Sequence, residues 1–368
     1  MSNLDHSTHW ITLQTQKVPI YVGNQLHKAL PQFCVKAGLK NKFVIVTHPE
    51  LKAYAEDLLN ALTEAGFRPY IFTIPTGESS KSLETLSHIL DYLLSLKLER
   101  QDTLIALGGG IVGDLTGFAA SIYMRGINLI QIPTSLLAQV DAAIGGKTGI
   151  NHTQGKNLIG SFYHPQFVLI DPTYLKTLPK REILCGLAEI VKYGVIQDKA
   201  LFLYIEENQE QIKDIAPETH PEIWRHLIER SVANKALVVS QDAKESHLRK
   251  ILNFGHTIGH AIETVYSYAY LHGEAVSIGM YAASSMAFEL GLLPLDDFNR
   301  ITTLLKNLGF HLFISTASVD LLEEAMTLDK KIKNGNVQFI LPTSVGNVII
   351  QEEISMDMVK KTLRKLMI

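Results

Sequence analysis

The sequence predicts an α/β fold, with an N-terminal Rossmann-like domain built on a parallel sheet and a C-terminal domain that is mostly α-helical. Three observations support this prediction. In the first half, short apolar runs alternate with amphipathic helical patterns, which is typical of βαβ units. A glycine cluster follows one of these runs directly, and helical patterns dominate after "TLPKREI" at 177–183. We therefore expect one domain over 1–178 and a second over 179–368.

The elements of the first half follow from their residue patterns in order. The run "KFVIVT" at 42–47 is apolar without alternation, as in a strand that is buried on both faces. The segment 51–66 has apolar residues spaced by three and four and ends at Gly66, and 81–96 repeats this helical spacing. Further strands are predicted at 69–74, 103–110, 127–134 and 167–172.

The second half has few strand patterns. The sequence "NVQFILPTSVGNVIIQEEI" at 336–354 predicts a β-hairpin that turns at Gly346–Asn347, and a last helix closes the chain. Helices are predicted at 182–196, 199–215, 221–242, 250–268, 273–291, 295–308 and 319–327.

Composition restricts the classes of function. The chain has 368 residues, 46% of them hydrophobic, and a net charge of −3, so it lacks the basic excess that nucleic-acid binding needs. The longest uncharged apolar segment, 275–288, is too short to span a membrane, and we expect no signal peptide at the start. Cys34 and Cys185 both lie in apolar surroundings, which favours a reducing cytoplasm. A cytoplasmic enzyme with a small-molecule substrate is therefore expected.

The glycine cluster lies in "TLIALGGGIVGDLTG", between a predicted strand and a predicted helix. Gly108, Gly110 and Gly113 match G-x-G-x-x-G, a pattern that brings backbone N–H groups close to a pyrophosphate. Two observations argue against a simple Rossmann dinucleotide site. The strand before the glycines is not the first strand of its domain, and no acidic residue ends the strand that follows. The alternative is a turn whose glycines only let helix and strand pack.

A second glycine motif, "GGKTG" at 145–149, invites comparison with a phosphate-binding P-loop. The P-loop pattern needs glycine where this chain has Asp141, so we exclude ATP hydrolysis. Lys147, Lys156 and Asn157 either surround an anion or belong to two polar surface loops.

Three histidines and two glutamates gather in 251–280. His256 and His260 are four residues apart and would share a helix face, with Glu263 or His272 as a third metal ligand. Glu189 lies in an apolar helical segment, where a carboxylate must be paired, bound to metal or protonated. The alternative is a set of core histidines that bond to the backbone. The pattern favours a C-terminal, mostly α-helical, metal-binding domain.

From about residue 75 to 345 the chain carries, in order, "GGGIVGDLTGFAAS", "YMRG", "IPTSLLAQVDAAIGGKTGINHTQGKNLIGSFYHP", "TLPKRE", "GLAEIVKYG", "RKILNFGHTIGHAIE", "LHGEAVSIGM" and "DKK". Together these motifs resemble the 3-dehydroquinate synthase family of the shikimate pathway. The resemblance implies zinc, or a similar divalent ion such as Co2+, on Glu189, His256 and His272. It gives His260 a role toward the substrate phosphate instead.

The resemblance also implies two further residue sets and a homodimer in which Arg125 reaches the neighbouring subunit's site. The implied NAD-binding residues are Glu78, Lys81, Gly109, Gly110, Asp114, Thr134, Ser135, Lys147, Lys156 and Thr177. The implied substrate-binding and catalytic residues are Asp141, Lys147, Asn157, Lys192, Lys235, Arg249, Asn253, His260 and Lys330. Two positions depart from the family: Ser135 replaces a threonine, and His48 or Glu50 stands where many members have a ribose-binding aspartate.

The implied reaction converts 3-deoxy-D-arabino-heptulosonate 7-phosphate to 3-dehydroquinate and phosphate. It proceeds by transient oxidation at C5 with NAD, phosphate elimination, re-reduction, ring opening and intramolecular aldol closure. Three alternatives remain: another sugar phosphate cyclase, a metal-dependent polyol dehydrogenase, or a non-catalytic protein that binds NAD or metal. Arg249 favours a substrate with a carboxylate, and a dehydrogenase would accumulate NADH.

Overall fold

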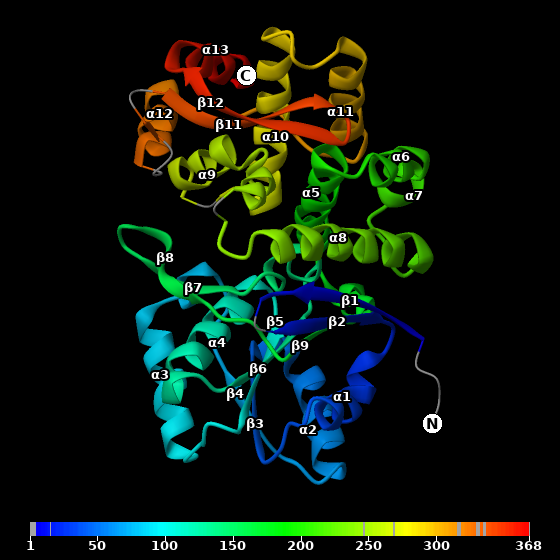
Figure 1. The fold of residues 1–368 in the computed structure, drawn as a ribbon, viewed down its shortest axis with the longest axis vertical. Coiled ribbons are helices and arrows are strands. Elements are labelled where there is room, and N and C mark those ends of the chain that lie inside the picture. The colour runs from blue at the N-terminus through cyan, green and yellow to red at the C-terminus, as the bar shows by residue number, and fades with distance from the viewer. Residues whose placement is uncertain are drawn as a thin grey trace. The chain divides into compact units, whose positions relative to one another are not determined.

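The structure is a computed structural model that describes residues 5–367 except 15, 246, 268, 315–317, 329–331 and 334–335. It divides into two compact units (Figure 1). Unit 1 comprises Met1–Leu178 and Lys235–Ala243, and unit 2 comprises Pro179–Asn234 and Lys244–Ile368. That 1–178 and 179–368 form separate domains stays a prediction.

A seven-stranded sheet forms the centre of unit 1. Its strand order is β1-β2-β9-β6-β5-β3-β4, and all neighbours are parallel except the antiparallel pair β1–β2. The predicted α/β class is thereby confirmed. The strands are β1 (His6–Thr12), β2 (Lys17–Gly23), β3 (Lys42–Thr47), β4 (Arg68–Thr73), β5 (Thr103–Gly108), β6 (Asn128–Pro133) and β9 (Phe167–Ile170).

Helices cover both faces of this sheet, as the unbroken apolar run at 42–47 predicts. Phe43 and Ile45 of β3 pack with the helices α1 (Leu30–Lys36) and α2 (Lys52–Glu64). Val44 and Val46 pack on the other face with α3 (Leu83–Ser95) and α4 (Gly110–Ile122). Figure 1 shows the two helix pairs on opposite sides of the strands. The sheet is therefore doubly wound, and its carboxyl edge is the expected position of a ligand site.

Unit 1 also contains elements that the sequence patterns did not predict. The strands β1 and β2 extend the sheet at one end, and β7 (Lys147–His152) and β8 (Gly155–Phe162) form an antiparallel hairpin. The two segments that we considered as polar surface loops, 145–149 and 155–157, thus contribute to this hairpin. Short turns of helix lie at η1 (Leu26–Ala29), η2 (Pro49–Leu51), η3 (Glu78–Ser80), η4 (Tyr123–Arg125), η5 (Ala138–Ala142) and η6 (Pro172–Thr177).

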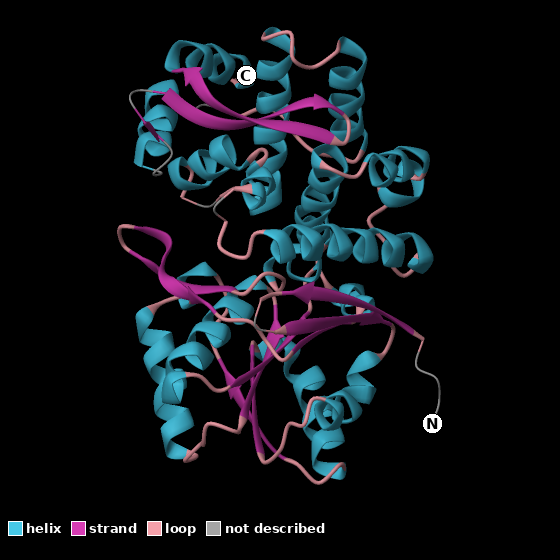
Figure 2. Cartoon of the chain, in the orientation of Figure 1, coloured by secondary structure: helices cyan, strands magenta, loops and turns pink. Residues whose placement is uncertain are grey.

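Unit 2 is mostly helical, with one three-stranded antiparallel sheet (Figure 2). The predicted hairpin is confirmed, and it turns at Gly346, whose φ is +90°. The elements of the second half are α5 (Lys180–Ile196), α6 (Lys199–Glu207), α7 (Gln209–Ile212), α8 (Pro221–Gln241), η7 (Leu248–Asn253), α9 (His256–Val265), α10 (His272–Glu289), α11 (Leu295–Asn307), α12 (Val319–Leu328), β10 (Ile332–Lys333), β11 (Asn336–Ser344), β12 (Asn347–Ser355) and α13 (Met356–Leu366).

Two predicted helices are each divided. The helix predicted at 250–268 becomes η7 and α9, because Gly255 between them adopts φ +79°, outside the helical region. The helix predicted at 199–215 becomes α6 and α7, separated at Asn208. Within the described ranges, every helix falls short of the length or the apolar character needed to cross a membrane.

Candidate active site

Three potential metal ligands lie together in unit 2. Glu189 of α5, His256 of α9 and His272 of α10 each offer one ligand atom, and these atoms lie within 4.8 Å of one another. Oε1 of Glu189 is 3.5 Å from Nε2 of each histidine. Two histidines and one glutamate are the ligand set of several catalytic zinc sites, and the same nitrogen and oxygen donors suit Co2+. The residues present therefore fit a divalent transition metal.

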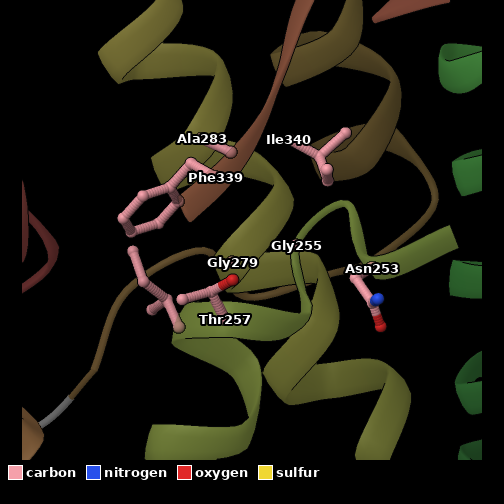
Figure 3. A pocket seen from close by; sticks show the side chains of 8 residues that line it. Asn253, Gly255, Thr257, Gly279, Ala283, Phe339 and Ile340 are labelled. Carbon is pink, nitrogen blue, oxygen red and sulfur yellow. The ribbon is translucent and has the colours of Figure 1, made fainter. Parts of the chain in front are cut away.

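Close helix packing brings these ligands together. A side chain at Gly273 would collide with the backbone of Cys185 on α5, and one at Gly279 would collide with the carbonyl of Gly255. These glycines therefore let α10 approach α5 and the start of α9. The turn at Gly255 comes directly before His256, the first residue of α9. Figure 3 shows Asn253 and Thr257 on opposite sides of this turn.

The electrostatics of the cluster depend on burial and on carboxylates. Glu189 is fully buried and forms an ion pair with Lys192, which is also buried. Burial, together with the positive charge of Lys192 and the neighbouring histidines, lowers the pKa of His256 well below its usual value. Burial also acts to lower the pKa of His272, but hydrogen bonds to Glu189 and Glu263 outweigh it and raise this pKa to about 10. His256 is therefore uncharged and offers a free nitrogen donor, whereas His272 would have to lose a proton before it could bind a metal.

The second nitrogen of each imidazole also has a partner. Nδ1 of His256 lies 3.0 Å from the carbonyl oxygen of Phe254, and Nδ1 of His272 lies 3.4 Å from Oε2 of Glu263. Both rings therefore turn Nε2 toward Glu189. Glu263, His260 and His272 form a second cluster of possible ligands. Among the described residues, neither cluster contains both His256 and His260. Their four-residue spacing led us to expect both histidines in one set of ligands, and the structure places them in different sets.

Two residues with implied substrate roles lie on η7, shortly before α9 in the chain. Arg249 of η7 is only 2% exposed, and Asn253 at the end of η7 donates from Nδ2 to Oε1 of Glu245 at 2.9 Å. No sequence pattern indicated this contact of Glu245, because it depends on how the segment before η7 folds. Lys330 lies outside the described residues.

In unit 1 the glycine turn joins β5 to α4, with Gly109 just before the helix and Gly110 as its first residue. A Cβ at Gly108 would lie 2.5 Å from a methyl group of Val112, so this glycine serves helix–strand packing. A Cβ at Gly109 would lie 3.3 Å from Oγ of Ser135. Thr134 donates its N–H to the carbonyl of Gly108 at 3.0 Å. The turn and the 134–135 segment therefore adjoin at the carboxyl edge of the sheet, and the glycines keep that edge free of side chains.

A polar network lies beside this turn. Lys81, 5% exposed, donates to Oδ2 of Asp114 and to Oδ1 of Asn157, each at 2.5 Å. Burial raises the pKa of Asp114, although Lys81 opposes this shift. The resemblance assigns Asn157 to the substrate, whereas the structure joins it directly to Lys81 of the implied NAD set. Its φ of +55° is in the left-handed region.

The network continues through the segment before α3. Nδ2 of Asn151 donates to Oε1 of Glu78 at 2.8 Å, and its Oδ1 accepts from the N–H of Asn157 at 3.2 Å. Nζ of Lys156 lies 3.6 Å from Glu78. Asn151 was absent from the predicted site, because only the folding of the hairpin β7–β8 reveals its contact with Glu78. Thr177, the last of the implied NAD residues, ends η6.

Four more predicted residues lie in unit 1. Nζ of Lys235 contacts both Oδ1 and the carbonyl oxygen of Asp141, at 2.7 and 2.5 Å. Asp141 belongs to η5, a turn of π-helix, and such turns occur frequently at functional sites. Lys147 is exposed at the start of β7. Arg125 is exposed, and both it and Met124 have positive φ values, +62° and +51°.

Comparison with solved structures shows which proteins share this fold. It matches a 2-epi-5-epi-valiolone synthase from Streptomyces hygroscopicus, solved with NAD+ and Zn2+ bound, with TM-score 0.88 and 28% identity over 96% of this chain and 98% of that one. It also matches a 2-deoxy-scyllo-inosose synthase complexed with carbaglucose-6-phosphate, NAD+ and Co2+, with TM-score 0.86 and 25% identity over 98% and 100% of the two chains. The fold and the glutamate–histidine cluster thus define a class, proteins built like the sugar phosphate cyclases.

Sequence comparison narrows this class to one family. The models of the 3-dehydroquinate synthase N-terminal and C-terminal regions match residues 71–185 and 186–332. A 3-dehydroquinate synthase from Rippkaea orientalis is 48% identical over 328 residues, which are 88% of this chain and 89% of that protein. The chain belongs to the 3-dehydroquinate synthase family, as the resemblance of its motifs predicted.

Proposed function

We propose that this protein is a 3-dehydroquinate synthase, which converts 3-deoxy-D-arabino-heptulosonate 7-phosphate to 3-dehydroquinate and phosphate. One observation carries the proposal: the Glu189, His256 and His272 cluster occurs in a chain that is 48% identical to a 3-dehydroquinate synthase. The two solved cyclases with other products are less similar, at 28% and 25% identity. The proposed pathway is aromatic amino acid biosynthesis.

The proposed cofactors are NAD, at the glycine turn of unit 1, and Zn2+ or Co2+, at the cluster of unit 2. When bound, NAD accepts and returns a hydride, and a divalent ion polarises the oxygen at the carbon that is oxidised and reduced. Glu189, His256 and His272 would hold the metal ion. Lys192 balances the charge of Glu189, and its proposed role toward the substrate is to donate a hydrogen bond to a hydroxyl group.

The remaining residues are proposed to bind the two anionic groups of the substrate. Arg249 presents a guanidinium group, which matches a carboxylate with two parallel hydrogen bonds. His260 and Asn253 can donate hydrogen bonds to phosphate oxygens, and His260 stabilises the departing phosphate. In unit 1, Lys235 and Lys147 supply further positive charge, and Asp141 orients Lys235 through the 2.7 Å contact.

Two alternatives make different demands on these residues. A cyclase whose substrate has no carboxylate would leave the buried charge of Arg249 without the substrate partner that we propose for it. A polyol dehydrogenase would consume NAD in proportion to substrate. Neither alternative needs a complete set of phosphate-binding and carboxylate-binding side chains, and for this reason we favour the synthase.

We also propose a homodimer in which Arg125 acts in the neighbouring subunit's site. Positive φ at two successive non-glycine residues costs on the order of 1–2 kcal/mol for each, so the conformation at Met124 and Arg125 needs a reason. Exposed apolar side chains lie along β8 and near the end of α4, and the two segments are joined by the 2.8 Å hydrogen bond of Ser161 to Ser121. These apolar residues are Ile122, Met124, Leu158, Ile159 and Phe162, from 40% to 59% exposed.

A cytoplasmic location is part of the proposal. Cys34 and Cys185 are free and buried, and burial raises the pKa of each thiol to about 12. Such thiols need no oxidising compartment, because they form no disulfide.

The experiment that tests the function follows phosphate and NADH together. Purified protein with Zn2+ and a catalytic amount of NAD is mixed with the heptulosonate phosphate. We expect one phosphate for each substrate consumed, while NADH absorbance stays near its starting value. NADH that accumulates in step with substrate loss, without phosphate, would establish a dehydrogenase instead.

A further inference from the structure

The imidazole of His272 lies between two carboxylates. Its Nε2 is 3.5 Å from Oε1 of Glu189, and its Nδ1 is 3.4 Å from Oε2 of Glu263. Glu263 belongs to α9, and only 6% of the surface of this residue is exposed to solvent. A carboxylate held this far from solvent loses hydration energy, so the partners that it has inside the protein determine its energy.

The packing of α9 against α10 produces this arrangement. A Cβ at Gly259 would lie 3.2 Å from the backbone of Val276 on α10, so the two helices are as close there as glycine permits. Glu263 lies one turn further along α9, and His272 is the first residue of α10. The contact between Glu263 and His272 therefore joins the two helices beside the ligand cluster.

The two histidines of the cluster are held in different ways. The carbonyl of Phe254, two residues before His256, holds the ring of that histidine locally at 3.0 Å. His272 follows the turn after α9, and its ring is held by a side chain nine residues earlier. Besides Glu189, the orientation of His272 thus depends on Glu263, which can be replaced without changing one of the three proposed metal ligands.

We propose that Glu263 is a positioning residue: its carboxylate fixes the rotamer and tautomer of His272 so that Nε2 faces Glu189, and it thereby sets the metal affinity of the cluster. This inference rests on the proposed function only in that a divalent metal binds there. Carboxylates behind ligating histidines raise metal affinity by about 10–100-fold, because they preorganise the ring and increase its basicity. The competing role is that of a ligand, since Glu263 also lies in the cluster with His260 and His272.

The test compares Glu263→Ala and Glu263→Gln with the wild-type protein. Metal-free protein is titrated with Zn2+ against a chromophoric chelator, and the visible spectrum of the Co2+-loaded protein reports the ligand field. Glu289→Ala is the matched control, because it removes the same charge from the other end of α10, where Glu289 pairs with Lys361 and Lys365. Far-UV circular dichroism of each metal-free variant shows that it is folded.

We expect Glu263→Ala to bind one equivalent of Zn2+ about 10–100-fold more weakly, with a shifted Co2+ spectrum. Glu263→Gln should lose less, because its amide oxygen still accepts a hydrogen bond, and it keeps the test valid if the alanine variant does not fold. Glu289→Ala should keep the wild-type affinity. Unchanged affinity and spectrum in both Glu263 variants would overturn the proposal.

A loss of affinity in Glu263→Gln of about 10³-fold or more, as expected at the upper end for a lost ligand, would also overturn the positioning role. The measurement does not depend on catalysis. A graded loss of affinity in a protein that releases no phosphate would support this inference while rejecting the proposed synthase activity.

Discussion

Replacing Glu189 by alanine should remove the metal and nearly all activity. Structural zinc sites with four ligands bind with about 10–16 kcal/mol, or roughly 2.5–4 kcal/mol per ligand. Loss of one ligand therefore weakens binding by about 10²–10³-fold. Glu189 is the proposed ligand that faces both histidines, since its Oε1 is 3.5 Å from each Nε2, so we expect the upper end of this range.

The same substitution should also destabilise the metal-free protein, because it leaves the ammonium group of Lys192 buried without its carboxylate. The side chains of Glu189 and Lys192 are 0% and 1% exposed. Removal of one partner of such a buried pair costs about 3–5 kcal/mol. Adding Lys192→Met to Glu189→Ala removes the stranded charge, so the double variant should be less destabilised than the sum of the single variants.

Two assays examine these expectations. Metal analysis after gel filtration gives the occupancy, and urea unfolding in the presence of a chelator gives the free energy of unfolding without metal. Glu289→Ala serves again as the control for loss of a glutamate in unit 2. A full equivalent of tightly bound zinc in Glu189→Ala would refute the ligand assignment, and strictly additive unfolding energies would refute the coupling to Lys192.

Three further outcomes are expected. His260→Ala should keep its metal and lose phosphate release, whereas His272→Ala should lose its metal, and the reverse result in metal analysis would favour the pairing by helix spacing. Inactive Arg125→Ala and Glu189→Ala subunits should regain part of the activity when mixed, and no recovery after proven subunit exchange would count against a shared site. Burial acts to raise the pKa of Asp198, but hydrogen bonds from an arginine and an asparagine of α8 outweigh it and lower this pKa. Its stabilisation should therefore be complete above the unfolded value of about 3.9 and be lost as pH falls through the lower native pKa. In urea unfolding, wild type and Asp198→Asn should differ by about 1–2 kcal/mol at pH 7, and this difference should begin to shrink only as the pH falls below about 4.

Much of the fold was predictable because its signals are local. The unbroken apolar run of β3 reflects burial on both faces, and the turn at Gly346 needs a positive φ that glycine supplies. The hairpin β7–β8 was missed for a physical reason. Four successive residues of β8, from Asn157 to Gly160, are exposed to solvent. Because this strand buries neither face continuously, its sequence shows neither an apolar run nor a clear alternation of apolar and polar residues.

The sequence indicated which residue types form the candidate site, but it did not indicate which of these residues lie together. A glutamate in an apolar helix, with a lysine three residues later, marked Glu189 as a buried charge that needs partners. What Glu263 does was open from sequence, because its contact with His272 depends on how α9 and α10 pack.

The spacing of His256 and His260 shows why a helix rule is incomplete at a metal site. The four-residue rule places two rings on one face, and these rings are indeed neighbours, with centroids 5.3 Å apart. Ligation depends on where single nitrogen atoms point, however. The carbonyl of Phe254 holds Nδ1 of His256 at 3.0 Å, and its Nε2 faces Glu189 on α5. The third candidate donor, His272, lies on α10, and the close approach of α10 depends on glycines at 273 and 279. Side-chain spacing within one helix cannot contain that information, because contacts between three helices create it.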